Sequence, residues 1–321
     1  MNHSDIIRAF GFQLPSDKIP ESVYAYAPVY RLKNAAGEWI VKRTQRPLAR
    51  AQAVAAWAYA VAAQGVQLIT PAQGFDENPR PFNVHDKVDE VWVVYPFVVG
   101  SAYTGDSTQI GAAGSLLGEI HALEFQEQFD LKTSGTVVAI EAAEIEQDID
   151  GILQYIHSFF SEFALAAAAI LAERRQKYFQ DSLPKMMETR LPLAICSWDY
   201  KASNLIYPNN NSPILVDIDN AAYIPRLYDL AIAALLFHNE GQGPGRLFTR
   251  SEWFVFLDSY TQHVQFTEGE KQAWDDLLLC AWIDEGLWLL RNDQAGWADP
   301  QQSQMLFSLL SIDLSTFAFS H

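Results

Sequence analysis

The sequence predicts an α+β fold in which a small β-rich lobe, residues 1–99, precedes a larger helical lobe, residues 100–321. Predicted strands are concentrated in the first hundred residues, whereas helical spacing of apolar residues dominates the rest. A Gly/Ser/Thr-rich segment, residues 100–106, separates the two regions. Strands and helices do not alternate regularly, which disfavours a doubly wound parallel sheet.

In the first lobe, two extended stretches, residues 22–32 and 38–44, flank an Asn-Ala-Ala-Gly turn signal at 34–37 and predict neighbouring strands. The Ala-rich stretch that follows predicts a helix over residues 48–64, because a proline precedes it and a glycine ends it. Val-Trp-Val-Val-Tyr at 91–95 predicts a third strand.

In the second lobe, a stripe of apolar residues predicts a helix over residues 108–123. The capping box Thr267-x-x-Glu270 predicts the start of another helix. The remaining predictions are a helical stretch over 138–190, short strands near 193–196, 205–207 and 214–218, and helices over 225–237, 250–263 and 301–317.

Composition excludes several classes of protein. Lysine and arginine number 22 against 39 aspartate and glutamate, a formal net charge of −17. This charge disfavours nucleic acid and anionic membranes as partners; it attracts cations, or it serves solubility alone. The two cysteines exclude a disulfide framework and a cysteine-rich zinc site. We see neither a secretion signal nor a membrane-spanning run, so we expect a cytoplasmic protein.

A set of oxygen-bearing residues beside short apolar runs predicts the chemistry. Phosphoryl transfer needs a carboxylate to orient and deprotonate the acceptor hydroxyl, and hard oxygen ligands for magnesium. The spacing suits Asp199 as the base, with Asn204 and Asp217 as magnesium ligands. Asp219, two residues further on, is either a further magnesium ligand or a residue that contacts the ligands without touching the metal. In the alternative interpretation these residues only cap turns and loop ends.

The same residues resemble the aminoglycoside phosphotransferase and choline kinase family of small-molecule phosphotransferases. Its hallmark is His-x-Asp-x-x-x-x-Asn, followed by an apolar strand that ends in Asp. The resemblance implies a protein-kinase-like bilobal fold, ATP and Mg²⁺ as cofactors, and the roles given above for Asp199, Asn204 and Asp217. It extends to Asp-Leu-Ala at 229–231, whose aspartate steadies the catalytic loop in that family. A helix N-terminal charge is the alternative for Asp229.

Further segments resemble the family's nucleotide-binding parts. Lys42 is expected to contact the nucleotide phosphates, the alternative being an ordinary edge-strand lysine. His121, at the end of a predicted helix, is expected to be a packed structural residue. The segment after the third predicted strand resembles the hinge that pairs with adenine. Its expected contacts are Tyr95, Phe97 and Val98.

The catalytic loop departs from the family pattern at its start. Ser197 stands where the family has histidine, and its hydroxyl can take over part of that residue's scaffold role. Trp198 replaces a small residue and either crowds the site or lines the acceptor pocket. Lys201 either stabilises the transferring phosphate, as a catalytic residue, or faces solvent.

The nucleotide side departs from the pattern as well. Residues 22–32 contain no glycine, so a glycine-rich phosphate clamp is missing. No acidic residue occurs between Thr44 and Phe75, so the predicted helix cannot supply the usual glutamate partner of Lys42. Gln52 is therefore expected to accept a hydrogen bond from Lys42 instead.

The acceptor side has one candidate wall, a helix carrying tryptophans and carboxylates. It suits an amine or a sugar; the alternative is a buried Trp stripe with exposed acids. The wall consists of Trp282, Asp284, Glu285 and Trp288.

We therefore predict an ATP- and Mg²⁺-dependent phosphotransferase that acts on a hydroxyl of a small polar molecule, including cationic ones. Candidate acceptors are an aminoglycoside-like antibiotic, an amino alcohol or a sugar. The alternative is a catalytically weak kinase-fold protein that binds a nucleotide or metabolite as a regulator or scaffold.

Overall fold

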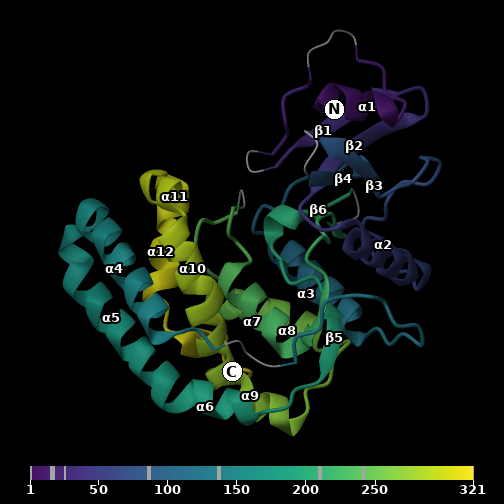
Figure 1. Cartoon of the computed structure of the whole chain (residues 1–321). Coiled ribbons are helices and arrows are strands. Elements are labelled where there is room, and N and C mark those ends of the chain that lie inside the picture. Colours follow the sequence, from purple (N-terminus) through teal and green to yellow (C-terminus); the bar gives the residue numbers. More distant parts are fainter. Residues whose placement is uncertain are drawn as a thin grey trace. The chain divides into compact units, whose positions relative to one another are not determined.

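The computed structural model describes residues 2–14, 19–24, 27–84, 88–135, 139–208, 212–240 and 243–320. Internal contacts divide the chain into two compact units, each described by itself below (Figure 1). The first unit comprises Met1–Gly100, Phe125–Leu131 and Ile214–Ala221, and the second comprises the rest. The first contains the main sheet and the second is mostly helical, which confirms the predicted α+β class.

The sheet of the first unit is antiparallel and four-stranded, in the order β1-β2-β4-β3. Its strands are β1 Val29–Asn34, β2 Gly37–Thr44, β3 Arg80–Val84 and β4 Val88–Pro96. The predicted turn joins β1 to β2, and the Asn34 side chain accepts from the Gly37 N–H. The predicted strand over 22–32 is shorter in the structure, because pairing with β2 begins only at Val29. Ala25, part of that prediction, lies outside the described residues.

Two helices belong to this part of the chain, one before β1 and one between β2 and β3. Helix α2, Leu48–Ala63, has almost the predicted bounds. Helix α1, His3–Ala9, was not predicted, although Asn2 and Asp5 form a capping box at its start. The apolar side chains of α1 pack into the core of the unit. That core contains Ile6, Ile7, Phe10, Phe12, Tyr30, Leu32, Val41, Ala72, Phe82, Trp92 and Val94.

The second unit is built on a close pair of helices, α3 Ser107–Ala122 and α8 Arg250–Tyr260. Gly114 and Gly118 lie where the two backbones meet. A Cβ atom at Gly114 would lie 2.1 Å from the Phe256 carbonyl oxygen, and one at Gly118 would lie 2.6 Å from the Tyr260 carbonyl oxygen. The apolar stripe that predicted α3 therefore works together with glycines that let α8 approach.

The predicted helical stretch over 138–190 is interrupted. Helix α4, Ala142–Phe159, ends where the Phe160 backbone leaves the helical region. A turn of π-helix at Tyr178–Ser182 separates α5 from α6. The predicted capping box begins α9, Glu268–Ala281. The other helices are α5 Ala164–Lys177, α6 Leu183–Glu188, α7 Arg226–Leu236, α10 Leu287–Asn292, α11 Gln294–Ala298 and α12 Pro300–Ser311.

A small sheet in the second unit positions the predicted catalytic loop. Strand β5, Leu193–Cys196, pairs antiparallel with β8, Ala222–Pro225, and both are largely buried. The loop leaves β5 after Cys196, and α7 begins directly after β8. The short strands β6, Leu205–Ile206, and β7, Ile214–Leu215, follow the loop in sequence. Among the described residues, no helix is both long enough and apolar enough to cross a bilayer.

Candidate active site

The loop after β5 holds the predicted base, Asp199, in a defined orientation. Asn204 Nδ2 donates to Asp199 Oδ2 at 3.1 Å and to the Asp199 carbonyl oxygen at 2.9 Å. Lys201 Nζ lies 3.4 Å from Asp199 Oδ1 and 3.0 Å from a carboxylate oxygen of Glu240. A donor therefore faces each carboxylate oxygen of Asp199.

These contacts also limit what the other two loop residues can do. The Lys201 side chain is only 13% exposed, so it does not simply face solvent. Asn204 uses its amide nitrogen inside the loop, which leaves Oδ1 as the oxygen that a hard cation can use. The loop thus brings together three predicted residues: a carboxylate, a cation and a neutral oxygen ligand.

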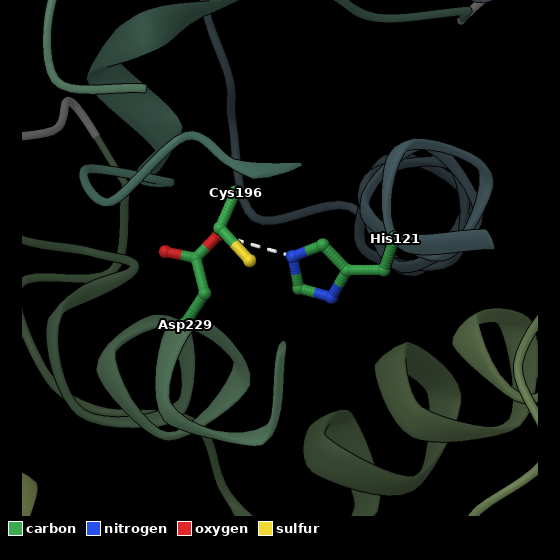
Figure 2. A group of neighbouring side chains, drawn as sticks. All are labelled: His121, Cys196 and Asp229. Carbon is green, nitrogen blue, oxygen red and sulfur yellow. Dashed lines mark hydrogen bonds and ion pairs between the residues drawn. The ribbon is translucent and has the colours of Figure 1, made fainter. Parts of the chain in front are cut away.

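A buried polar network supports the loop from behind. Asp229, in the first turn of α7, is fully buried, and its Oδ2 lies 3.1 Å from His121 Nε2 and 3.4 Å from Ser197 Oγ. Nδ1 of His121 lies 3.0 Å from the Tyr260 hydroxyl. Figure 2 shows the imidazole directed at the Asp229 carboxylate. Ser197 thus connects the start of the loop to α7, and His121 is a packed residue as predicted.

Cys196 completes a group of side chains whose types also bind transition metals. The candidate ligand atoms of His121, Cys196 and Asp229 lie within 4.8 Å of one another (Figure 2). Burial raises the pKa of Cys196 well above its ordinary value, so the sulfur is a thiol at neutral pH. The thiol points to the Ala194 carbonyl oxygen, at 3.6 Å, and His121 already bonds Asp229. We interpret the group as a hydrogen-bonded support for the loop.

The first unit holds a cluster of opposite charges around Lys42 on β2. Lys42 Nζ lies 2.8 Å from Asp217 Oδ2 and 3.2 Å from Asp219 Oδ2. The side chains of Lys42 and Asp219 are 15% and 17% exposed, whereas that of Asp217 is 37% exposed. Sequence reasoning named all three residues but did not predict that Lys42 would pair with both carboxylates.

Burial and charge oppose each other in this cluster. Burial acts to lower the pKa of Lys42, but the carboxylates of Asp217 and Asp219 outweigh it and raise that pKa, so the amine is charged at neutral pH. Burial raises the pKa of Asp219, while attraction to Lys42 acts in the opposite direction. The cluster is therefore a compact site in which each charge depends on the others.

Two expectations for the nucleotide side need correction. Gln52 is exposed on α2, and the hydrogen bond expected from Lys42 to Gln52 is not formed, because the ammonium group is directed to Asp217 and Asp219. The N–H of Phe97 donates to the Glu38 carbonyl oxygen at 2.9 Å, which continues the β2–β4 pairing. That N–H is therefore not available to an adenine ring.

The other two residues of the predicted hinge, Tyr95 and Val98, differ in how deeply they are buried. Tyr95 is buried in β4, and Val98 is half-buried. Within the described part of the chain, the N–H of Val98 has no protein acceptor. Of the expected adenine contacts Phe97 and Val98, only Val98 therefore keeps a backbone N–H without a protein acceptor among the described residues, and its role stays a prediction.

The second unit has a small hollow beside the catalytic loop, which we compare with the predicted acceptor wall. Its walls include Trp198, Tyr228 and Asp284, and much of the remaining lining is apolar, for example Met186 and Leu277. The Tyr228 hydroxyl donates to Asp284 Oδ2. Burial raises the pKa of Asp284, and this hydrogen bond acts to lower it. The hollow therefore combines aromatic side chains with a carboxylate.

Trp198 joins this hollow to the catalytic loop. Its backbone lies in the left-handed region, with φ 53°, a conformation that is costly for a bulky residue and common at functional sites. Lys132 Nζ lies 4.8 Å from the centre of the indole ring. Trp198 therefore lines this hollow, and its predicted role as a wall of the acceptor pocket stays a prediction.

Glu285 follows Asp284 in the same turn. Burial, followed by repulsion from Asp284 and Asp199, raises the pKa of Glu285 to about 7, and a hydrogen bond from the Trp198 side chain acts to lower it. No lysine, arginine or histidine of the described residues forms an ion pair with Asp284 or Glu285. Repulsion from Asp199 also indicates that this carboxylate pair lies near the predicted base.

The two tryptophans of the predicted acceptor wall behave differently. Trp282 is fully buried, and its indole nitrogen donates to the Leu309 carbonyl oxygen at 2.9 Å, so Trp282 belongs to the core. Trp288 is 60% exposed. The aromatic partners of Asp284 and Glu285 are instead Trp198 and Tyr228, which are distant in sequence. No spacing in the sequence connects Tyr228 with Asp284. Only packing brings α7, which carries Tyr228, beside the turn that carries Asp284.

Comparisons with known proteins identify the fold and the family. A search of curated proteins found no match to the sequence. Among solved structures, an amicoumacin kinase in complex with AMP-PNP and Ca²⁺ aligns with a TM-score of 0.66 at 15% identity, covering 97% of this chain and 92% of that one. A microcompartment-associated aminopropanol kinase aligns at 0.60 and 11%, covering 96% and 94%.

An aminoglycoside phosphotransferase from Alicyclobacillus acidocaldarius aligns with a TM-score of 0.56 at 15% identity, covering 89% of this chain and 90% of that one. These likenesses confirm the predicted kinase-like fold. A family model, described as the phosphotransferase enzyme family, matches residues 25–255, which include Lys42, Asp199, Asn204 and Asp217. The family resemblance and the phosphotransferase class expected from the sequence are thereby confirmed: this chain belongs to the phosphotransferase enzyme family.

Proposed function

We propose that the protein transfers a phosphoryl group from ATP, with magnesium, to a hydroxyl group of a small amine-bearing molecule. The observation that carries the proposal is the catalytic loop, in which Asn204 and Lys201 orient the Asp199 carboxylate. A general base must be held in position to be effective, and phosphoryl transfer asks the protein mainly for positioning and charge.

The loop residues have distinct roles in this proposal. Asp199 accepts the proton of the acceptor hydroxyl as the oxygen attacks phosphorus. Lys201 fixes one oxygen of that carboxylate and offers positive charge near the transferred group. Ser197 and Asp229 hold the loop against α7, so they act on the reaction only through the position of Asp199.

The nucleotide side rests on charge and ligand chemistry. Lys42 is the cation for the nucleotide phosphates. Asn204 and Asp217 are the magnesium ligands, since an amide oxygen and a half-exposed carboxylate are the hard donors that Mg²⁺ prefers. Magnesium, when bound, neutralises charge on the phosphates. Because the reaction needs ATP, we propose the cytoplasm as its location.

The acceptor side favours a positively charged molecule. Asp284 and Glu285 form no ion pair within the described residues, and the aromatic side chains of Trp198 and Tyr228 line the same hollow as Asp284. Carboxylates and aromatic faces both attract ammonium groups. An amino alcohol or an amine-bearing antibiotic fits this chemistry better than a neutral sugar, and aminopropanol and amicoumacin are the molecules named for two structures of similar fold.

The test is magnesium-dependent ADP release with a panel of amino alcohols, aminoglycosides and neutral sugars. We expect the Asp199→Asn variant to lose roughly 10²–10⁴-fold in turnover, the usual contribution of a positioned general base. Asp275→Asn, on an exposed position of α9, is the matched control and keeps full activity. Unchanged turnover in Asp199→Asn would show that another group is the base.

A further inference from the structure

Lys42 has two carboxylate partners, and the structure distinguishes between them. Asp217 is the nearer, at 2.8 Å against 3.2 Å for Asp219. Asp217 is also the more open, because 37% of its side chain is exposed against 17% for Asp219. An incoming cation can therefore reach Asp217 from solvent, whereas Asp219 is largely enclosed.

The enclosed position of Asp219 is built from several contacts. Besides Lys42, the Thr44 side chain lies beside its carboxylate, where hydrogen bonding acts to lower the pKa of Asp219. Thr44 and Lys42 lie on the same strand, two residues apart, so their side chains point to the same face. Asp219 is thus held against β2 by two side chains of that strand.

Among the described residues of the first unit, Lys42 has no other carboxylate partner. The segment between Thr44 and Phe75, which includes all of α2, contains no acidic residue. Arg43, the neighbour of Lys42, pairs with Glu90, so that carboxylate is already used. A lysine this buried needs a charged partner to remain protonated, and only Asp217 and Asp219 provide one among the described residues.

We infer that Asp219 is the lasting counter-ion of Lys42, a positioning residue rather than a magnesium ligand, and that Asp217 alone of this pair is available to the metal. The inference rests on the proposed function. It follows that Lys42 keeps its orientation when Asp217 is engaged elsewhere. Helix α2 then needs no carboxylate to pair with Lys42, so its lack of acidic residues does not leave the lysine charge unbalanced.

The experiment compares Asp219→Asn with Asp217→Asn in the full chain. We expect Asp219→Asn to raise the KM for ATP roughly tenfold to a hundredfold, the loss of one charge-assisted contact, with a smaller effect on kcat and an unchanged magnesium titration midpoint. Asp217→Asn should instead shift the magnesium midpoint. Asp219→Glu, which keeps the charge, should restore most of the ATP affinity.

A second measurement is independent of turnover. Calorimetry of ATP binding in EDTA reports on Lys42 without any metal, and there Asp219→Asn should weaken binding while Asp217→Asn leaves it nearly unchanged. If Asp219→Asn instead shifts the magnesium midpoint and leaves metal-free binding intact, Asp219 is a metal ligand and the inference is wrong. If the wild type binds ATP but phosphorylates nothing, the proposed function fails, and the calorimetric comparison still decides the role of Asp219.

Discussion

Two acidic groups of this protein differ in how their charge is balanced. In the first unit, Asp217 and Asp219 share the internal cation Lys42. In the second unit, Asp284 and Glu285 have no such partner among the described residues, and burial raises the pKa of both. The negative charge of the first group is balanced by Lys42, whereas the second group has no internal cation, which is why we propose that it receives a cationic acceptor. Similar residue types thus form an internal ion-pair cluster in one place and, under the proposed function, a recognition site in the other.

The largest effect is expected from removing the internal cation. Lys42→Met leaves two carboxylates close together without compensation, one of them largely buried. Breaking a buried ion pair costs about 3–5 kcal/mol, and the exposure of Asp217 reduces this to about 2–3 kcal/mol. Urea unfolding at neutral pH measures the loss.

Lys42→Arg is the control, because it keeps the charge and should lose much less stability. Magnesium should raise the melting temperature of Lys42→Met more than that of the wild type, because the metal replaces the missing charge. A Lys42→Met variant as stable as the wild type would show that the ion-pair cluster does not stabilise the fold.

A smaller effect is expected from removing the carboxylates that lack a cation. Asp284→Asn combined with Glu285→Gln should raise the KM for an amine acceptor roughly tenfold to a hundredfold, because the charge attraction of the carboxylates is lost and only the cation–π contact remains. The KM for ATP should not change. Steady-state kinetics with an amino alcohol and its uncharged carbon analogue separate charge from shape.

Asp275→Asn again serves as the matched control on the same helical segment. Equal losses for the charged and the uncharged acceptor would mean that the two carboxylates only shape the pocket.

The smallest effect concerns pH. The pKa of Glu285 is raised to about 7, so its carboxyl is neutral below that pH and anionic above it. Binding of a cation therefore strengthens as pH rises through about 7. For a quaternary ammonium alcohol, whose charge does not titrate, we expect the KM to fall roughly threefold to tenfold between about pH 6 and pH 8. Glu285→Gln should flatten this dependence, and a profile that persists in the variant would assign it to another group.

Local signals predicted much of the fold. The turn at 34–37, the alanine-rich run of α2, the stripe of α3 and the capping box of α9 each fixed an element, because the cause lies within a few neighbouring residues. The breaks inside the 138–190 stretch were not predictable, since a π-turn depends on packing against other helices. Helix α1 was also missed, although its capping box was readable.

The sequence by itself predicted the class of chemistry, from a carboxylate, an amide and a second carboxylate at a set spacing, and the family match over residues 25–255 confirms that class. Only the tertiary structure decided the partners. Lys42 forms ion pairs with Asp217 and Asp219 rather than a hydrogen bond with Gln52. Trp198 and Tyr228 line the hollow with Asp284, whereas Trp282 is buried in the core. The reason is physical: spacing along a strand or loop sets which residues can share a face, whereas the partner of a buried charge is whatever distant segment packing brings within a few ångströms.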